Sequence, residues 1–147
     1  VRLIKGFLSE DEKNNIIRIS DCLVSLHRSE GFGLSLAEAM VLGKPVIATA
    51  YSGNLDFMNS SNSLLVNYEL IPVGENDYPE SDGQVWAEPN ENQAIEYISQ
   101  LIESPQLGKE IGFQANFDIR LNLSYLAVGN LMVERVKAIE SHFRQSK

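Results

Sequence analysis

Short apolar runs alternate with helix-like segments through the first half of this chain. The apolar runs predict strands at residues 3–8, 22–26, 46–49 and 63–66. Parallel strands need a crossover connection of about a dozen or more residues, and the segments between these runs are long enough to supply one. Such alternation favours an α/β fold with right-handed crossovers. We therefore predict a Rossmann-like parallel sheet flanked by helices.

The predicted helices begin and end at recognisable signals. Ser9 and Glu12 form a capping-box pattern that opens a helix running to about residue 20. A second helix is predicted to start at Ser35 and to end before Gly43, a residue suited to the position after a helix. Further helices are predicted over residues 55–58 and 91–104, from Pro105, and after a capping serine, Ser124. The apolar face of the 91–104 helix is predicted to contain Ala94, Ile95, Ile98, Leu101 and Ile102.

Residues 73–89 interrupt this alternation. Their polar, acidic and turn-forming composition predicts a solvated loop. A calcium loop is the weaker alternative, because the acidic residues lack the required spacing and no glutamate closes the loop. Trp86, near the end of the segment, is expected to pack over the sheet and not to stack on a sugar.

Composition narrows the class of protein. The 147 residues, 44% of them hydrophobic and 22% charged, predict one globular domain over residues 1–147. A formal charge of −8 argues against a nucleic acid or an anionic membrane as the main partner, because phosphate groups need a basic face. The single cysteine, Cys22, allows no disulfide within the chain and is expected to be a small buried residue.

The sequence also suggests where the protein acts. No apolar run approaches the length of a membrane span, and no signal peptide opens the chain. We expect a cytoplasmic protein, with peripheral attachment to the inner membrane face as an option for the full-length form. Val1 begins directly in a strand-like run without a starting methionine, so we expect a fragment of a longer protein.

A glycine-rich turn follows the predicted strand 22–26 and leads into a helix. It contains Gly31 and Gly33, which permit positive φ and let a ligand approach the backbone. The N–H groups of residues 32–35 have no helical partner and would point at an anion bound there. The turn is therefore a candidate phosphate site.

Two carboxylates accompany this turn. Glu30 precedes it, and Glu38 lies about one helical turn inside the following helix. Both can accept hydrogen bonds from sugar hydroxyls. The loop after the strand 46–49, which contains Gly53, is expected at the same edge, because ligands of parallel sheets bind at the carboxyl ends of the strands. A diphosphate beside a polyol suggests a nucleotide sugar.

Structural roles explain part of the same pattern. Ser35 and Glu38 form a capping box by themselves, so Glu38 is either a helix cap or a ligand. His27 either contacts the sugar or leaving phosphate, or packs at the strand end. Arg28 pairs either with a phosphate or with nearby Glu30. The turn lacks the third glycine of a dinucleotide fingerprint and the lysine of a P-loop, and no ligand cluster suggests a metal.

Four segments of the chain together match one known family, at residues 30–34, 38–40, 43–49 and 52–54. With them the sequence resembles the carboxyl-terminal domain of the retaining glycosyltransferases of family four, which adopt the two-domain GT-B fold. The match covers most of residues 1–66 and, more loosely, the later helices. The narrower likeness is to mannosyl- and rhamnosyltransferases of bacterial surface polysaccharide assembly.

The resemblance implies roles for the residues of the turn. Glu30 would bind hydroxyls of the donor sugar and steady the charge that develops at its ring. Glu38 would bind the ribose hydroxyls. The other implied donor contacts are the backbone of Gly31, Phe32, Gly33, Leu34 and Ser35, which would meet the sugar or diphosphate, and Gly6, Phe7 and Leu8, which would pass beside the nucleobase.

The implied activity is transfer of a hexose, with mannose favoured, from a nucleoside diphosphate sugar to a growing glycan, without a metal or other cofactor. A glycan or lipid-linked glycan acceptor would bind an amino-terminal domain that this chain lacks. The family's arginine–lysine pair on the diphosphate would lie upstream of Val1, because Arg2 and Lys5 are too close to the first predicted strand to be that pair. We therefore expect half a catalytic site, inactive in isolation.

Two alternatives stay open. One is half of a nucleotide-sugar epimerase, whose acid and base groups would lie in the absent part. The other is a non-catalytic nucleotide-binding scaffold module. The presence of both Glu30 and Glu38 disfavours the scaffold, because a scaffold does not need the second carboxylate.

Overall fold

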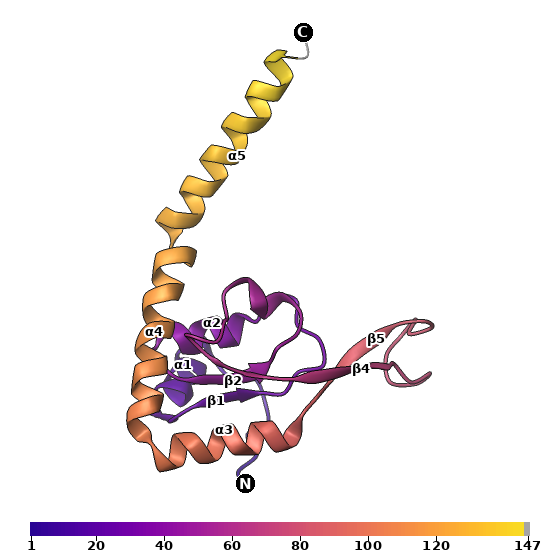
Figure 1. Ribbon diagram of the computed structural model, residues 1–147, viewed down its shortest axis with the longest axis vertical. Helices are drawn as coiled ribbons and strands as arrows, with labels where there is room; N and C mark the ends of the chain where they lie inside the picture. Colours follow the sequence, from indigo (N-terminus) through magenta and orange to yellow (C-terminus); the bar gives the residue numbers. More distant parts are fainter. Residues whose placement is uncertain (146–147) are drawn as a thin grey trace.

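The computed structural model describes residues 1–145 and contains a three-stranded parallel sheet (Figure 1). Its strands are β1 (Leu23–Ser25), β2 (Val46–Thr49) and β3 (Leu64–Val66), in the order β1-β2-β3. All four residues of the central strand β2 are buried. The α/β fold with a parallel sheet that the sequence predicts is confirmed.

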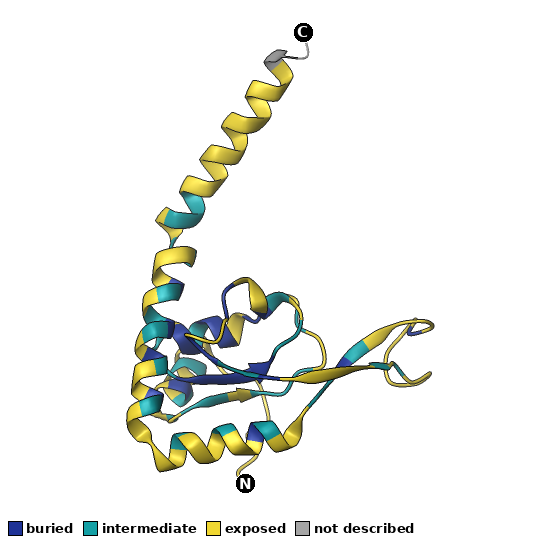
Figure 2. Ribbon diagram, in the orientation of Figure 1, coloured by how far each residue is buried: buried dark blue, intermediate teal, exposed yellow. Residues whose placement is uncertain are grey.

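Helices cover both faces of the sheet (Figures 1 and 2). The helices α1 (Glu10–Ile19), α2 (Leu34–Val41) and α4 (Pro105–Leu123) contribute to one apolar cluster, and α3 (Glu91–Glu103) contributes to another. The arrangement is the layered one expected of an α/β domain, with a sheet between helices.

Side chains of β2 alternate between these two clusters, as the pleat of a strand requires. Val46 and Ala48 belong to the larger cluster with α1, α2 and α4. Ile47 packs on the other face with Val66 of β3 and Ala94 of α3. Because both faces are covered, β2 has the continuous apolar run typical of parallel strands.

The start of α1 follows its sequence signal. The Ser9 N–H donates to Glu12 Oε2 over 2.8 Å, and the Glu12 N–H donates to Ser9 Oγ over 3.3 Å. The bonds from the backbone and then the hydroxyl of Ser9 hold the pKa of Glu12 below its usual value. The predicted capping box is therefore confirmed.

The first predicted strand, residues 3–8, is wrong. Residues 1–8 form no helix or strand, and all of them are exposed, including Phe7 and Leu8. A strand exists only where a neighbour satisfies its backbone hydrogen-bonding groups, and no described strand pairs with this segment. An apolar run shows propensity for a strand, but it does not supply the neighbour.

An antiparallel hairpin occupies part of the segment predicted as a loop (Figure 1). It consists of β4 (Tyr68–Pro72) and β5 (Val85–Pro89), with Leu70 opposite Ala87. The hairpin extends away from the parallel sheet, and residues 73–84 form its irregular tip. The predicted loop is confirmed for the tip and wrong for β5. The five residues of β5 are too few to show a clear strand pattern next to a long run of turn-forming residues.

The bounds of the helices after residue 90 agree well with the prediction, but the predicted burial of their apolar residues agrees less well. Asn90 caps α3 by accepting from the Gln93 N–H over 3.0 Å. Ala94 is buried, but Ile95 and Ile102 are 59% and 74% exposed, so only part of the predicted apolar face is in the core. The short helix predicted at residues 55–58 is a 3-10 helix, η1, at Gly53–Asp56.

The last helix, α5 (Tyr125–Gln145), projects away from the rest of the molecule (Figure 1). Its predicted cap is present, since the Ala127 N–H donates to Ser124 Oγ over 3.2 Å. Nearly all of α5 is exposed (Figure 2). Within the described chain, α5 and the other helices are too short or too polar to cross a bilayer.

Gly112 sets how closely α4 approaches the turn after α2. A Cβ at this position would lie 2.9 Å from the carbonyl carbon of Gly43 and 3.4 Å from that of Lys44. We expect Gly112→Ala to lower the free energy of unfolding by about 1–3 kcal/mol through overpacking, measured by urea denaturation. Gly129→Ala is the matched control, because no atom lies within 4 Å of its Cβ position. Equal stability of the two variants would contradict the prediction.

Candidate functional site

The glycine turn joins β1 to α2 at the carboxyl edge of the sheet. Gly33 is the N-cap of α2 and has a φ of +89°, whereas Gly31 has no positive φ. The predicted Ser35–Glu38 capping box is wrong, because the helix begins earlier, at Leu34, and no side chain of the described residues caps it. The first N–H groups of α2 are therefore left to meet an anion.

The loop after β2 holds this turn in place. The Gly53 N–H donates to the Glu30 carbonyl over 3.1 Å, and Ser52 Oγ donates to the same oxygen over 2.6 Å. A Cβ at residue 53 would lie 2.6 Å from the carbonyl carbon of Gly31. The loops after β1 and β2, which the sequence places at one edge of the sheet, are therefore in direct contact through their backbones.

Asn54 fixes the second loop from inside and was missed in the sequence analysis. Its side chain is buried, and its amide nitrogen donates to the Thr49 carbonyl over 3.0 Å. A Cβ at Gly33 would lie 3.4 Å from the Asn54 Cβ. The only local signal is the asparagine directly after a turn glycine, which does not reveal burial.

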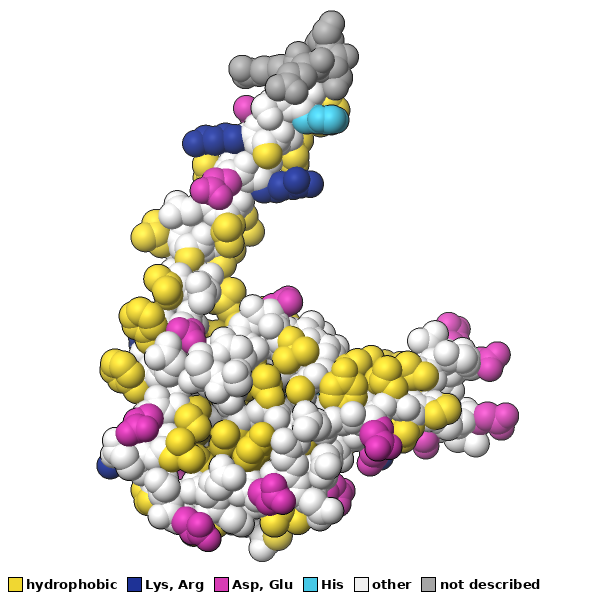
Figure 3. All heavy atoms as spheres, in the orientation of Figure 1, with side chains coloured by type: hydrophobic (Ala, Val, Ile, Leu, Met, Phe, Trp, Pro, Cys, Tyr) yellow, Lys and Arg dark blue, Asp and Glu magenta, His cyan; other side chains and the backbone are white. Residues whose placement is uncertain are grey.

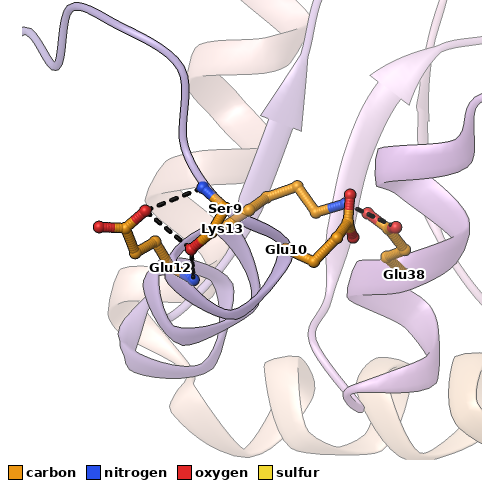
Figure 4. A network of polar contacts seen from close by, with 5 residues as sticks. All are labelled: Ser9, Glu10, Glu12, Lys13 and Glu38. Carbon is orange, nitrogen blue, oxygen red and sulfur yellow. Dashed lines mark hydrogen bonds and ion pairs between the residues drawn. The ribbon is translucent and has the colours of Figure 1, made fainter.

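Glu38 is held by a lysine from another helix (Figure 4). Lys13 Nζ of α1 lies 2.7 Å from Glu38 Oε1 and 2.7 Å from Glu10 Oε2. The hydrogen bonds with Glu10 and then Glu38 raise the pKa of Lys13. Glu38 Oε2 is buried and has no hydrogen-bond partner among the described residues. One carboxylate oxygen is therefore fixed by an ammonium group, and the other lacks a donor.

Sequence reasoning missed Lys13 as a site residue. The spacing of Glu10 and Lys13 suggests a local ion pair on α1. Nothing in the sequence indicates that the same ammonium group reaches Glu38, 25 residues away.

His27 packs at the strand end, the second of its two predicted roles. Its Nε2 lies 3.1 Å from the Tyr51 carbonyl oxygen, and its Nδ1 lies 3.2 Å from Ser25 Oγ. Both partners belong to the ends of strands or their loops. The histidine therefore links the loop after β1 to the loop after β2.

Arg28 pairs with the hairpin and not with Glu30, its predicted protein partner. Its Nη2 lies 2.7 Å from Glu88 Oε2, and its guanidinium carbon lies 4.7 Å from the centre of the Trp86 ring. The Ala87 N–H donates to the Arg28 carbonyl over 2.9 Å. The prediction that Trp86 packs over the sheet is also wrong, because β5 carries this ring beside Arg28.

Two hollows lie beside the glycine turn. The hairpin cavity, of about 730 Å³, lies between the turn and the hairpin tip and is lined in part by Glu30 and Gly31. The helix groove, of about 680 Å³, lies between α1, α2 and the junction of α4 with α5 and is lined in part by Phe32, Leu34 and Glu38. The two glutamates therefore line different hollows, and residues 31–34 run from the lining of the first to that of the second.

The predicted nucleobase contacts are not brought to this site. Gly6, Phe7 and Leu8 line neither the hairpin cavity nor the helix groove. The absence of the first predicted strand leaves them on an exposed segment.

Neither a cluster of metal-ligating side chains nor a reactive thiol lies among the described residues. No group of three or more His, Cys, Asp or Glu side chains in residues 1–145 is arranged to hold a metal ion. Cys22 is half-buried, and burial raises its pKa to about 11. Its thiol is therefore protonated at neutral pH and a poor nucleophile.

Known proteins are similar to this chain in sequence and in fold. The family model described as Glycosyl transferases group 1 matches residues 3–116. A trehalose synthase from Pyrococcus horikoshii is 31% identical over 111 residues, which is 76% of this chain and 22% of that protein. The Anabaena protein Alr3699/HepE in complex with UDP-glucose is 20% identical, with a TM-score of 0.64 over 91% of this chain and 31% of that chain.

The same Anabaena protein in complex with UDP matches with a TM-score of 0.60 over 84% of this chain and 29% of that chain. This chain therefore spans about a fifth of the curated relative and about a third of the solved chains. The structural likeness confirms the α/β fold.

Proposed function

This chain belongs to the Glycosyl transferases group 1 family, and from that membership we propose that it is the donor-binding domain of a retaining hexosyltransferase with two-domain GT-B architecture. The enzyme would transfer a hexose from a nucleoside diphosphate sugar to a growing glycan, without a metal. Mannose is the proposed hexose, and surface polysaccharide assembly at the cytoplasmic side of a membrane is the proposed setting.

One observation carries this proposal. Glu30 and Glu38 line two hollows, and the short segment that runs from one lining to the other contains the N-terminus of α2, which no described side chain caps. A nucleotide sugar has the same layout, with a sugar and a nucleoside on either side of a diphosphate. Backbone N–H groups and the helix dipole favour an anion at the start of a helix. The hexose would lie toward Glu30 and the ribose toward Glu38.

The proposed roles use groups that the structure leaves available. Glu38 Oε2 has no donor among the described residues, so it can accept from a ribose hydroxyl while Lys13 holds Oε1. The backbone of residues 31–35 would meet the diphosphate or sugar. Residues 6–8 would contact the base only after moving toward the helix groove. His27 and Arg28 already have protein partners and would position the loops.

Catalysis would then depend on charge. The departing diphosphate gains negative charge, which preorganised N–H groups stabilise more strongly than water does. An amino-terminal domain would bind the acceptor, and a segment upstream of Val1 would supply the basic pair. The present chain alone is therefore proposed to bind donor without transferring it. Half of a nucleotide-sugar epimerase and a binding scaffold are the competing functions.

Calorimetric titration tests the proposal directly. The chain would be titrated with UDP, GDP, UDP-glucose and GDP-mannose, since mannose is the proposed hexose and UDP-glucose is bound by the Anabaena neighbour. We expect binding of at least one sugar nucleotide, and none of the four binding would contradict a donor site. Product analysis with a labelled donor in the larger enzyme would separate a transferase from an epimerase or a scaffold.

Glu38→Gln provides the sharper test of the ribose site. Because Glu38 does not cap α2, its replacement should act on ligand binding and on the Lys13 contact. We expect nucleotide affinity to fall by about 1–3 kcal/mol, since glutamine is a poorer acceptor for a diol. Glu10→Gln is the matched control, because it removes the other carboxylate from Lys13 and should leave affinity unchanged. Equal nucleotide binding by both variants would remove Glu38 from the site.

A further inference from the structure

Strand β5 of the hairpin contacts Arg28, in the loop that leads into the glycine turn. Arg28 makes an ion pair with Glu88, stacks on Trp86, and accepts a backbone bond from Ala87. The Arg28 side chain belongs to the loop that continues into Glu30. These contacts therefore fix the position of β5 relative to the glycine turn, and with it the shape of the cavity between them.

The lining of the hairpin cavity is amphipathic. Tyr78 and Trp86 contribute aromatic rings, and Glu30, Glu80 and Gln84 contribute groups able to form hydrogen bonds. Its volume of about 730 Å³ lies within the range of small-ligand sites. Aromatic rings offer flat apolar surfaces, and carboxylates and amides bind hydroxyl groups.

The charges of the lining disfavour a phosphate as the occupant. The one cation of the lining, Arg28, is already paired with Glu88. Two carboxylates, those of Glu30 and Glu80, line the cavity. Acidic side chains also gather at the free end of the hairpin (Figure 3). A neutral polyol suits these surroundings better than an anion, because an anion would meet two carboxylates that pair with no cation of the described residues.

A pyranose ring has the matching chemistry. One of its faces presents C–H groups that pack on an aromatic ring, and its edge presents hydroxyls that donate to carboxylates. We propose that the hairpin cavity binds a neutral hexopyranose, with Tyr78 as its stacking platform and the hairpin as a specificity element. The proposal rests on the proposed function in one respect, the molecule that carries the hexopyranose ring. That molecule is either the sugar-nucleotide donor or the acceptor glycan.

Tyr78→Ala tests this site without threatening the fold. Tyr78 is 68% exposed at the hairpin tip, so its removal leaves the core intact. Tyr78→Phe keeps the ring and should keep binding. Leu70→Ala is the matched control, because Leu70 is an exposed apolar residue of the same hairpin outside the cavity lining. Circular dichroism would confirm that all three variants keep the fold.

The measurements use the present chain with six probes, four nucleotides and two methyl glycosides. UDP-glucose and GDP-mannose are compared with UDP and GDP by calorimetry, and methyl α-mannoside and methyl α-glucoside are followed by saturation-transfer NMR. If the ring is the donor hexose, Tyr78→Ala weakens a sugar nucleotide at least about fivefold, the loss of one aromatic contact, and leaves the free nucleotide unchanged. If the ring belongs to the acceptor, Tyr78→Ala abolishes the methyl glycoside signals and spares the sugar nucleotides.

The proposal is overturned if Tyr78→Ala matches Leu70→Ala in every one of these titrations, or if wild type shows neither glycoside signals nor any preference for a sugar nucleotide over its nucleotide. Failure of all nucleotides to bind would instead contradict the proposed donor site. The NMR measurement with the methyl glycosides would then still test by itself whether the hairpin cavity binds a hexopyranose.

Discussion

Glu30→Gln in the enzyme that contains this domain is expected to lower the turnover number by about 10²–10³-fold, while nucleotide affinity changes little. The proposed site puts this carboxylate beside the transferring hexose, where positive charge builds as the bond to phosphate breaks. An interaction that strengthens in the transition state lowers the rate constant when it is lost, and not only the binding. Glutamine keeps the size of the side chain and removes its charge.

The fold should tolerate this change. The main-chain carbonyl of Glu30, and not its carboxylate, accepts the bonds from Gly53 and Ser52 that hold the turn. Steady-state kinetics at saturating donor would measure the effect, with Glu69→Gln on the exposed face of β4 as the control. A loss of turnover below about tenfold, or 1.4 kcal/mol, would reduce Glu30 to a passive sugar contact.

Gly53→Ala is expected to damage the site more than any other single methyl group. The added Cβ would lie 2.6 Å from the Gly31 carbonyl carbon and 3.1 Å from the Phe32 Cα. Both neighbours are backbone atoms, which cannot rotate away as a side chain can. The glycine turn must therefore shift, and the N–H groups at the start of α2 shift with it.

We expect Gly53→Ala to cost about 3 kcal/mol or more of stability, the upper end of overpacking, and to abolish measurable nucleotide binding. Thermal unfolding and calorimetry would report the two effects. Gly31→Ala is the matched control for stability, because no atom lies within 4 Å of its Cβ position and its φ is not positive. Its effect should stay within about 0.5 kcal/mol. Similar melting temperatures for the two variants would show that the loops are not in close contact.

The elements that the sequence predicted well are those encoded within a few residues. The capping box of Ser9 and Glu12 lies within one helical turn, and the buried run 46–49 reports a strand covered on both faces. The strand, glycine turn and helix around Gly33 are likewise local, and so is the placement of Glu30 before the turn and Glu38 after it. Local sequence also identified the edge of the sheet where the loops after β1 and β2 meet.

The errors in prediction concern contacts between distant segments. Residues 3–8 have strand propensity, yet no described neighbour supplies their hydrogen bonds. The Ser35–Glu38 pattern satisfies the rule for a capping box, but α2 begins one residue earlier, at Leu34, so Ser35 is not its cap. Arg28 pairs with Glu88, and not with its sequence neighbour Glu30, because β5 packs beside the Arg28 loop in the folded chain.

By itself, the sequence determined the α/β class with its parallel sheet and a glycine turn flanked by two carboxylates, because periodicity, caps and turns act over a few residues. Only the tertiary structure decided that Lys13 holds Glu38, that Glu30 and Glu38 line separate hollows, and that a hairpin closes one of them. Those features depend on which remote segments come into contact, and that choice is made by the packing of the whole chain.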